Sequence, residues 1–106
     1  MEMTTKIYSV GSLDDYLLQV GRVVMVDNQE IAIFRTSDGN VYAIENKSPH
    51  PKGGPLAEAI VAGHYIYDPL YDWKIDLITG LVQSPDTGQV VTYPVNVKNG
   101  EIHLTL

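Results

Sequence analysis

Residues 46–56 read Asn-Lys-Ser-Pro-His-Pro-Lys-Gly-Gly-Pro-Leu, and residues 68–73 read Asp-Pro-Leu-Tyr-Asp-Trp. These two Pro-containing stretches, the first loop and the second loop, are separated by a segment long enough for one or two short strands. Each carries a pair of polar side chains around a proline: Ser48 and His50 in the first, and Asp68 and Tyr71 in the second. This spacing predicts two loops that close on each other and present four side chains to one point.

Length and charge restrict the kinds of protein this can be. A chain of 106 residues without an internal linker predicts a single domain over residues 1–106. The formal net charge of −6 argues against binding to nucleic acid or to an anionic membrane, because both require a basic surface. Without a signal peptide or an 18-residue apolar run, we expect a soluble, cytoplasmic protein.

The chain contains no cysteine. A disulfide bond, a thiolate nucleophile, a Cys-ligated zinc site and a Cys-ligated iron–sulfur cluster are therefore all excluded within this chain.

Short β-type runs separated by turn residues predict an all-β domain, folded as a small antiparallel sandwich or a partly open barrel. Asp38-Gly39 and Asn99-Gly100 indicate hairpins, and Pro94 interrupts a strand and places it at an edge or a bulge. Ser12 is expected to cap one helical turn over residues 13–18. The expected strands cover residues 6–10, 22–26, 31–36, 41–44, 65–67, 73–77, 89–97 and 102–106, with residues 56–62 ambiguous between strand and turn.

The two loops resemble the cluster-binding loops of Rieske-type ferredoxin domains. In that family the first loop carries Cys-x-His, followed by Gly-Gly-Pro-Leu, and the second carries Cys-x-x-His. This chain retains the features around those motifs from about residue 20 to its end, including the eighteen-position interval from His50 to Asp68. The retained residues are Pro49, His50, Gly53, Gly54, Pro55, Leu56, Pro69, Leu70 and Trp73.

The resemblance also identifies four degenerate cluster-ligand positions. Ser48 and Asp68 stand where the family has cysteines, Tyr71 stands where it has a histidine, and only His50 is retained. A Rieske centre needs two thiolates on one iron and two imidazoles on the other. We therefore expect no cluster, no metal site and no catalytic residue in this chain.

Rieske-like domains of this length that lack the ligands are similar to the small subunit of assimilatory NAD(P)H-dependent nitrite reductase. This similarity implies a non-catalytic subunit that docks on the large subunit, where nitrite is reduced to ammonium. The cofactors, which are siroheme, a [4Fe–4S] cluster, FAD and NAD(P)H, would belong to that partner. Residues 47–56 and 67–73 are expected to form part of the interface.

Two other functions remain open from the sequence. The chain could be a Rieske-type electron-transfer protein or a mononuclear metalloprotein that uses the altered ligands, although one imidazole and one carboxylate make a weak transition-metal site. It could also be a free-standing binding or scaffold module of another oxidoreductase system. In the simplest structural interpretation the four polar side chains hydrogen-bond one another, and Gly53-Gly54 supplies positive φ angles.

Overall fold

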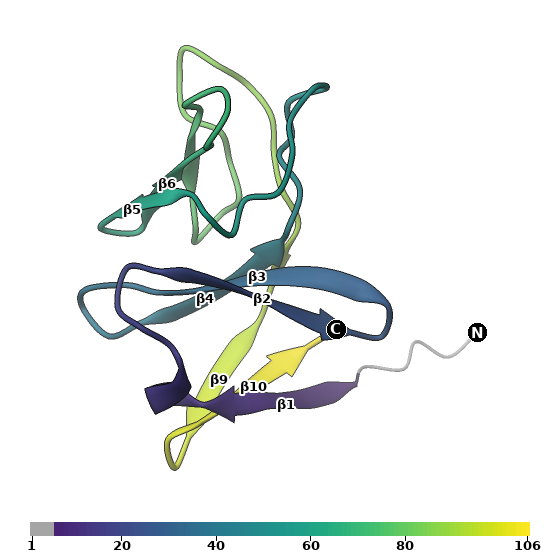
Figure 1. Ribbon diagram of the computed structural model, residues 1–106, viewed down its shortest axis with the longest axis vertical. Coiled ribbons are helices and arrows are strands. Elements are labelled where there is room, and N and C mark those ends of the chain that lie inside the picture. Colours follow the sequence, from purple (N-terminus) through teal and green to yellow (C-terminus); the bar gives the residue numbers. More distant parts are fainter. Residues whose placement is uncertain (1–5) are drawn as a thin grey trace.

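A computed structural model describes residues 6–106 as three small antiparallel sheets stacked one above another (Figure 1). The lower sheet has the order β1-β10-β9, the middle sheet β2-β3-β4-β8 and the upper sheet β5-β6-β7. The all-β class is confirmed. The strands are β1 (Ile7–Ser12), β2 (Gly21–Val26), β3 (Gln29–Arg35), β4 (Val41–Glu45), β5 (Ile60–Ala62), β6 (Tyr65–Tyr67), β7 (Lys74–Asp76), β8 (Thr92–Tyr93), β9 (Val95–Lys98) and β10 (Glu101–Thr105).

The middle sheet separates two hydrophobic cores. Successive side chains of β3 point to opposite faces, so Ile31 and Ile33 pack with the lower sheet while Ala32 and Phe34 pack with the upper sheet. All four are fully buried. Because β3 is covered on both faces, its apolar residues form a continuous run instead of alternating with polar ones.

Tight turns fix the register of two hairpins. Asp27 and Asn28 both have positive φ (52° and 64°), as do Asn99 and Gly100 (53° and 75°). Two such residues form the type I′ turn that matches the twist of paired strands. The predicted Asn99-Gly100 hairpin is therefore confirmed. Asp38-Gly39 also joins paired strands, but within a longer loop of residues 36–40, which the Thr36 N–H closes by donating to the Asn40 carbonyl (2.9 Å).

The expected helical turn over residues 13–18 is shorter than predicted. Only the 3-10 helix η1 (Leu13–Asp15) forms, capped by Ser12 and Asp15 in a reciprocal capping box. The chain becomes extended at Tyr16 (φ −113°, ψ 119°), whose side chain is buried in the lower core and donates a hydrogen bond to the Val10 carbonyl (2.5 Å). Burial of this ring requires the extended backbone and ends the helix.

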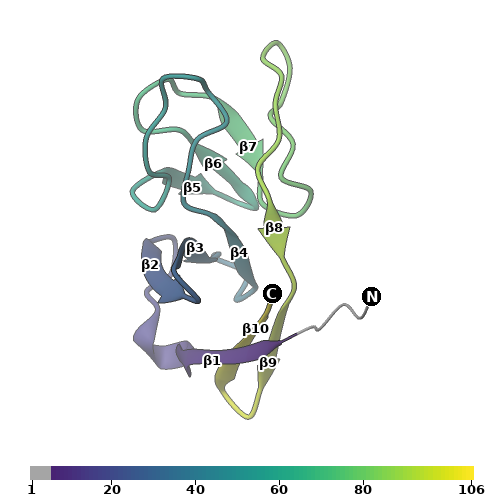
Figure 2. The same ribbon diagram turned by 90° about the vertical axis from the view of Figure 1, so that its right-hand side faces the viewer.

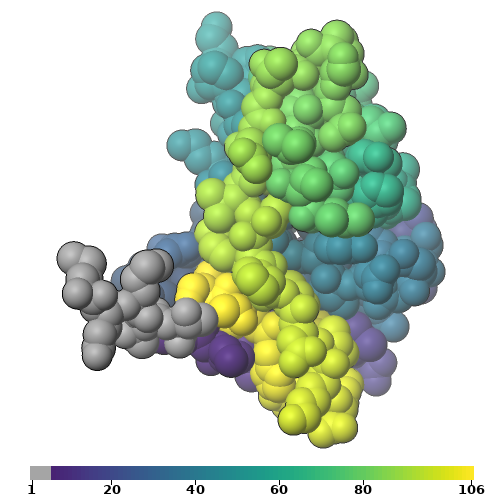
Figure 3. All heavy atoms as spheres, turned by 180° about the vertical axis from the view of Figure 1, so that it is seen from behind, coloured from purple at the N-terminus to yellow at the C-terminus, as the bar shows by residue number. Residues whose placement is uncertain are grey.

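Pro94 marks the point where the chain leaves one sheet and enters another. β8 is the last strand of the middle sheet, and β9 is the outer strand of the lower sheet. Figure 2 shows this segment running from the upper part of the molecule to the bottom, and Figure 3 shows it as a continuous band of side chains across one face. The prediction of an edge position at Pro94 is confirmed, because both strands that it joins are edge strands.

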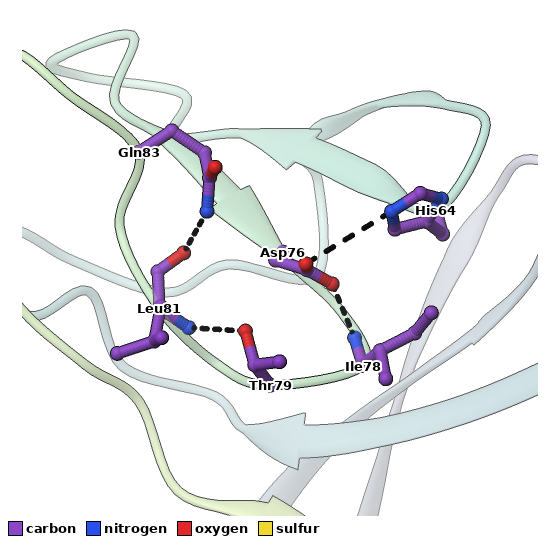
Figure 4. Close-up of polar contacts among 6 residues, drawn as sticks. All are labelled: His64, Asp76, Ile78, Thr79, Leu81 and Gln83. Carbon is purple, nitrogen blue, oxygen red and sulfur yellow. Dashed lines mark hydrogen bonds and ion pairs between the residues drawn. The ribbon is translucent and has the colours of Figure 1, made fainter.

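Side chains reinforce the turn that follows β7 (Figure 4). Asp76 Oδ1 accepts a hydrogen bond from the Ile78 N–H (2.8 Å), and Asp76 Oδ2 lies 3.9 Å from His64 Nε2. The Thr79 hydroxyl accepts from the Leu81 N–H (3.2 Å). The two hydrogen bonds are local to the turn, whereas the Asp76–His64 contact joins it to the β5–β6 hairpin. No helix within residues 6–106 has the length and apolar character needed to span a membrane.

Candidate functional site

The first loop is anchored at its base by Asn46, which follows β4 and is buried. Its side-chain oxygen accepts hydrogen bonds from the backbone N–H groups of Leu56 (2.8 Å) and Ala57 (2.9 Å). These bonds join the first residue of the loop to its end. Asn46 was not among the predicted site residues. Its signal in the sequence is an Asn directly after an apolar strand and before a Pro-rich segment, a position where side-chain-to-backbone bonding is common.

Ser48 and Asp68 connect the two loops. The Ser48 hydroxyl donates a hydrogen bond to Asp68 Oδ2, and both side chains are only 3% exposed. The same hydroxyl accepts from the His50 N–H (3.2 Å), and the Ser48 N–H donates to the Gly54 carbonyl (2.8 Å). Both side chains are thus fully used in holding the loops together.

Asp68 also shapes the second loop. Its Oδ1 accepts hydrogen bonds from the N–H groups of Leu70 (2.8 Å) and Tyr71 (3.3 Å). The Asp68 N–H donates to the Trp73 carbonyl (2.9 Å), and the loop closes through Asp72, whose φ of 58° is left-handed. With the Ser48 hydroxyl, this buried carboxylate receives three donors, which compensates for its loss of hydration.

His50 belongs to an aromatic stack instead of a ligand set. Its ring lies parallel to that of Tyr71, with centroids 3.7 Å apart and an interplanar angle of 5°. The Trp73 ring meets His50 edge-on at 4.8 Å. His50 Nδ1 accepts a hydrogen bond from the Lys52 N–H (2.9 Å), so its lone pair at this nitrogen is already engaged. Trp73, one of the residues retained from the Rieske-type loops, thus contacts the candidate site through His50.

The expectation that Gly53-Gly54 supplies positive φ angles is wrong. Neither residue has a left-handed backbone. Gly53 is required for another reason: a Cβ atom there would lie 2.3 Å from Ser48 Cβ and 2.4 Å from Ser48 Oγ. The backbone of Gly53 passes directly against the Ser48 side chain, so the space is needed. A Cβ atom at Gly54 would meet only Leu70 Cδ1, at 3.7 Å.

The structure brings together all four side chains predicted to meet, but as two pairs: Ser48 with Asp68, and His50 with Tyr71. This donor set does not fit a Rieske [2Fe–2S] centre, which takes two thiolates and two imidazoles. It offers one imidazole and no thiolate, with hydroxyl groups at Ser48 and Tyr71 and a carboxylate at Asp68. Residues 6–106 contain no group of three or more His, Cys, Asp or Glu placed to hold a metal ion.

Solved structures with the same fold include proteins assigned as nitrite reductase small subunits and dioxygenase ferredoxins. The E. coli protein NirD is 25% identical, with a TM-score of 0.84 and coverage of 97% of this chain and 98% of that one. A Mycobacterium tuberculosis protein assigned as the small subunit of an NADH-dependent nitrite reductase is 22% identical, with a TM-score of 0.87 and coverage of 98% and 97%. The ferredoxin of carbazole 1,9a-dioxygenase from Nocardioides aromaticivorans is 29% identical, with a TM-score of 0.83 and coverage of 92% and 95%.

No curated protein matches this chain. The family described as the Rieske-like [2Fe-2S] domain matches residues 6–105, nearly the whole length. This match agrees with the sheet arrangement and with the paired loops. The chain therefore belongs to the family of Rieske-like [2Fe-2S] domains.

Proposed function

We propose that this protein is the non-catalytic small subunit of a cytoplasmic NAD(P)H-dependent nitrite reductase. In this proposal it docks on the siroheme-containing large subunit, which reduces nitrite to ammonium. The observation that carries the proposal is the Ser48–Asp68 hydrogen bond. This buried polar contact joins two intact Rieske-type loops. It is formed by two residues at positions where a cluster-bearing relative would have ligands.

The four positions Ser48, His50, Asp68 and Tyr71 are, in this proposal, former ligand positions that now serve the structure. The loops keep their shape because hydrogen bonds and stacking replace metal coordination as the link between them. A domain that keeps two protruding loops without a redox centre is suited to binding, since loops positioned by a rigid sheet commonly form contact surfaces. The exposed side chains of Leu70 (66%) and Tyr71 (38%) fit this role.

The similarity to NirD of E. coli and to the Mycobacterium tuberculosis protein supports nitrite reductase as the system. Similarity to carbazole dioxygenase ferredoxins supports a second candidate, because another solved structure contains such a ferredoxin in complex with an oxygenase. Electron transfer by this chain would, however, need a redox group that its side chains are not suited to ligate. Docking without electron transfer is therefore the function that we favour.

Affinity purification from cells growing on nitrite tests the proposal. Tagged protein should recover a chain whose absorption spectrum contains the siroheme bands, together with NAD(P)H-dependent nitrite reduction. Repeated purification under these conditions without a siroheme chain would contradict the proposal. Metal analysis of the protein purified alone tests the second candidate, which requires stoichiometric iron or zinc.

A further inference from the structure

A shallow, mainly apolar groove with a volume of about 390 Å³ lies beside the two loops, on the side toward β2. Figure 2 shows β2 at one edge of the middle sheet, on the same side as β5 of the upper sheet. The groove is formed by residues far apart in the sequence. We call it the β2 groove and define it by Val23, Glu30, Pro55, Glu58, Pro69 and Leu70.

The groove is the part of the middle sheet that the upper sheet leaves uncovered. Val23 pairs with Ala32 across the ladder, and Met25 pairs with Glu30, so these four side chains share the upper face. Ala32 is fully buried, whereas Val23 is 40% exposed and Met25 is 64% exposed. Val23 lines the groove together with Leu70 of the second loop, so the apolar surface continues into the loops already proposed as an interface.

The charged residues around the β2 groove indicate what kind of partner surface would bind there. Glu30 and Glu58 are exposed and line the groove. Within the described residues neither carboxylate forms an ion pair with a basic side chain. The protein as a whole carries a formal charge of −6. An apolar depression flanked by two unpaired carboxylates favours a cationic partner surface.

We propose that the β2 groove receives an apolar side chain of the partner protein, with Lys or Arg residues beside it that contact Glu30 and Glu58. The identification of that partner as the catalytic nitrite reductase chain rests on the function proposed above. A second copy of this protein is a poorer occupant, because joining two β2 grooves would bring four carboxylates together. The proposal therefore adds β2 and Glu58 to an interface that the sequence predicts only in the loops.

The proposal is tested with purified catalytic chain and two pairs of exposed variants. Leu70→Asp introduces a charge into the groove, and its control Val97→Asp does the same on β9 of the lower sheet, where the side chain is 41% exposed. Glu58→Lys reverses a groove charge, and its control Asp14→Lys reverses an exposed charge in η1. Each groove variant should weaken binding about tenfold or more, while the controls bind like the wild type. Binding by the wild type should also weaken with added salt, and weaken less for Glu58→Lys.

The outcomes separate this proposal from the function on which it rests. If the wild type binds the catalytic chain and the groove variants bind equally well, the β2 groove is not part of the interface, although the proposed function stands. If wild-type protein shows no binding, the proposed function fails. The groove is then judged by a ¹⁵N NMR titration with the synthetic peptide Arg-Leu-Arg-Leu-Arg.

That titration should shift backbone signals of Val23, Glu58 and Leu70 more strongly than the equally charged peptide Arg-Ala-Arg-Ala-Arg. Equal or scattered shifts with the two peptides would overturn the proposal. Sedimentation analysis provides a further check. A concentration-dependent dimer that Leu70→Asp abolishes and Val97→Asp preserves would assign the groove to a second copy of the chain, which also overturns it.

Discussion

Ser48 and Asp68 join the two loops through a hydrogen bond between side chains that are both almost completely buried. The bond connects residues twenty positions apart and lies at the centre of the candidate site. The Ser48 hydroxyl also accepts a hydrogen bond from the His50 N–H of its own loop, and Asp68 Oδ1 accepts from the Leu70 and Tyr71 N–H groups of its own loop. These bonds link the two loops to each other and fix the backbone of each loop around the pair.

Ser48→Ala should lower the free energy of unfolding by about 1–3 kcal/mol, because it leaves Asp68 Oδ2 buried without its donor. Urea denaturation measures this change. Ser37→Ala is the matched control, since Ser37 is exposed in the loop after β3. Equal stability of the two variants would show that the Ser48–Asp68 bond contributes nothing to the fold.

Gly53→Ala should destabilise the protein by about 1–3 kcal/mol, because the new methyl group would overlap the Ser48 side chain. Gly54→Ala provides the comparison, since its methyl group would reach only ordinary contact with Leu70 and its backbone is not left-handed. We expect Gly54→Ala to retain wild-type stability within about 0.5 kcal/mol in the same urea experiment. A larger loss from Gly54→Ala than from Gly53→Ala would contradict the close-approach explanation.

Much of the fold was predictable because it depends on local signals. The turn residues Asn99 and Gly100 determine a hairpin through their own backbone preferences, and β3 is recognisable from its apolar run. The extent of η1 was not predictable. The capping box at Ser12 is local, but the end of the helix is decided by burial of Tyr16 against a core built largely from distant strands.

The sequence predicted which residues form the candidate site, but not how their side chains are arranged. Loop spacing placed four side chains near one point, and the structure brings them together. The division into a hydrogen-bonded pair and a stacked pair depends on side-chain orientations that spacing cannot supply. The role of Gly53 was missed for a similar reason, since a close approach to Ser48 is a tertiary contact, whereas positive φ is the usual local explanation for a glycine.

Tyr71→Phe should preserve the stack on His50, since the contact involves the faces of the rings and no hydrogen bond from the Tyr71 hydroxyl is needed. Tyr71→Ala should remove it and cost about 0.5–1.5 kcal/mol. The His50 ring-proton NMR signals report the stack directly, because they lie within the ring current of Tyr71. We expect large shifts of these signals in Tyr71→Ala and small ones in Tyr71→Phe. Unchanged signals in Tyr71→Ala would exclude stacking in solution.

Stability should fall at alkaline pH partly through Tyr16. Burial raises the pKa of its hydroxyl, an effect that the nearby Arg22 guanidinium opposes only in part. The unfolded chain therefore releases this proton at a lower pH than the folded chain does. The contribution to stability is complete below the ordinary tyrosine pKa of about 10 and is lost as pH rises through the folded-state pKa.

Urea denaturation between pH 8 and pH 11 tests the role of Tyr16, with Tyr16→Phe as the comparison. The variant should be less stable by about 1 kcal/mol at pH 8, because it lacks the hydrogen bond to Val10. Its stability should fall less steeply with pH than that of the wild type. Identical slopes would assign the alkaline loss to other groups, such as Tyr93, whose pKa is also raised by burial and by the Glu45 carboxylate.

Restoring the family's ligands should restore metal binding if Ser48, Asp68 and Tyr71 are former ligand positions. The triple variant S48C/D68C/Y71H, with His50 unchanged, supplies two thiolates and two imidazoles on the two loops. After anaerobic treatment with iron and sulfide it should hold about two iron atoms per chain and give a paramagnetic signal when reduced. The wild type should do neither.

The control variant S37C/T87C carries two exposed cysteines outside the site and should bind little iron under the same treatment. If the triple variant keeps the wild-type circular dichroism spectrum yet binds no more iron than this control, these residues do not occupy ligand positions, and the explanation of the Ser48–Asp68 bond as a replacement for a cluster fails.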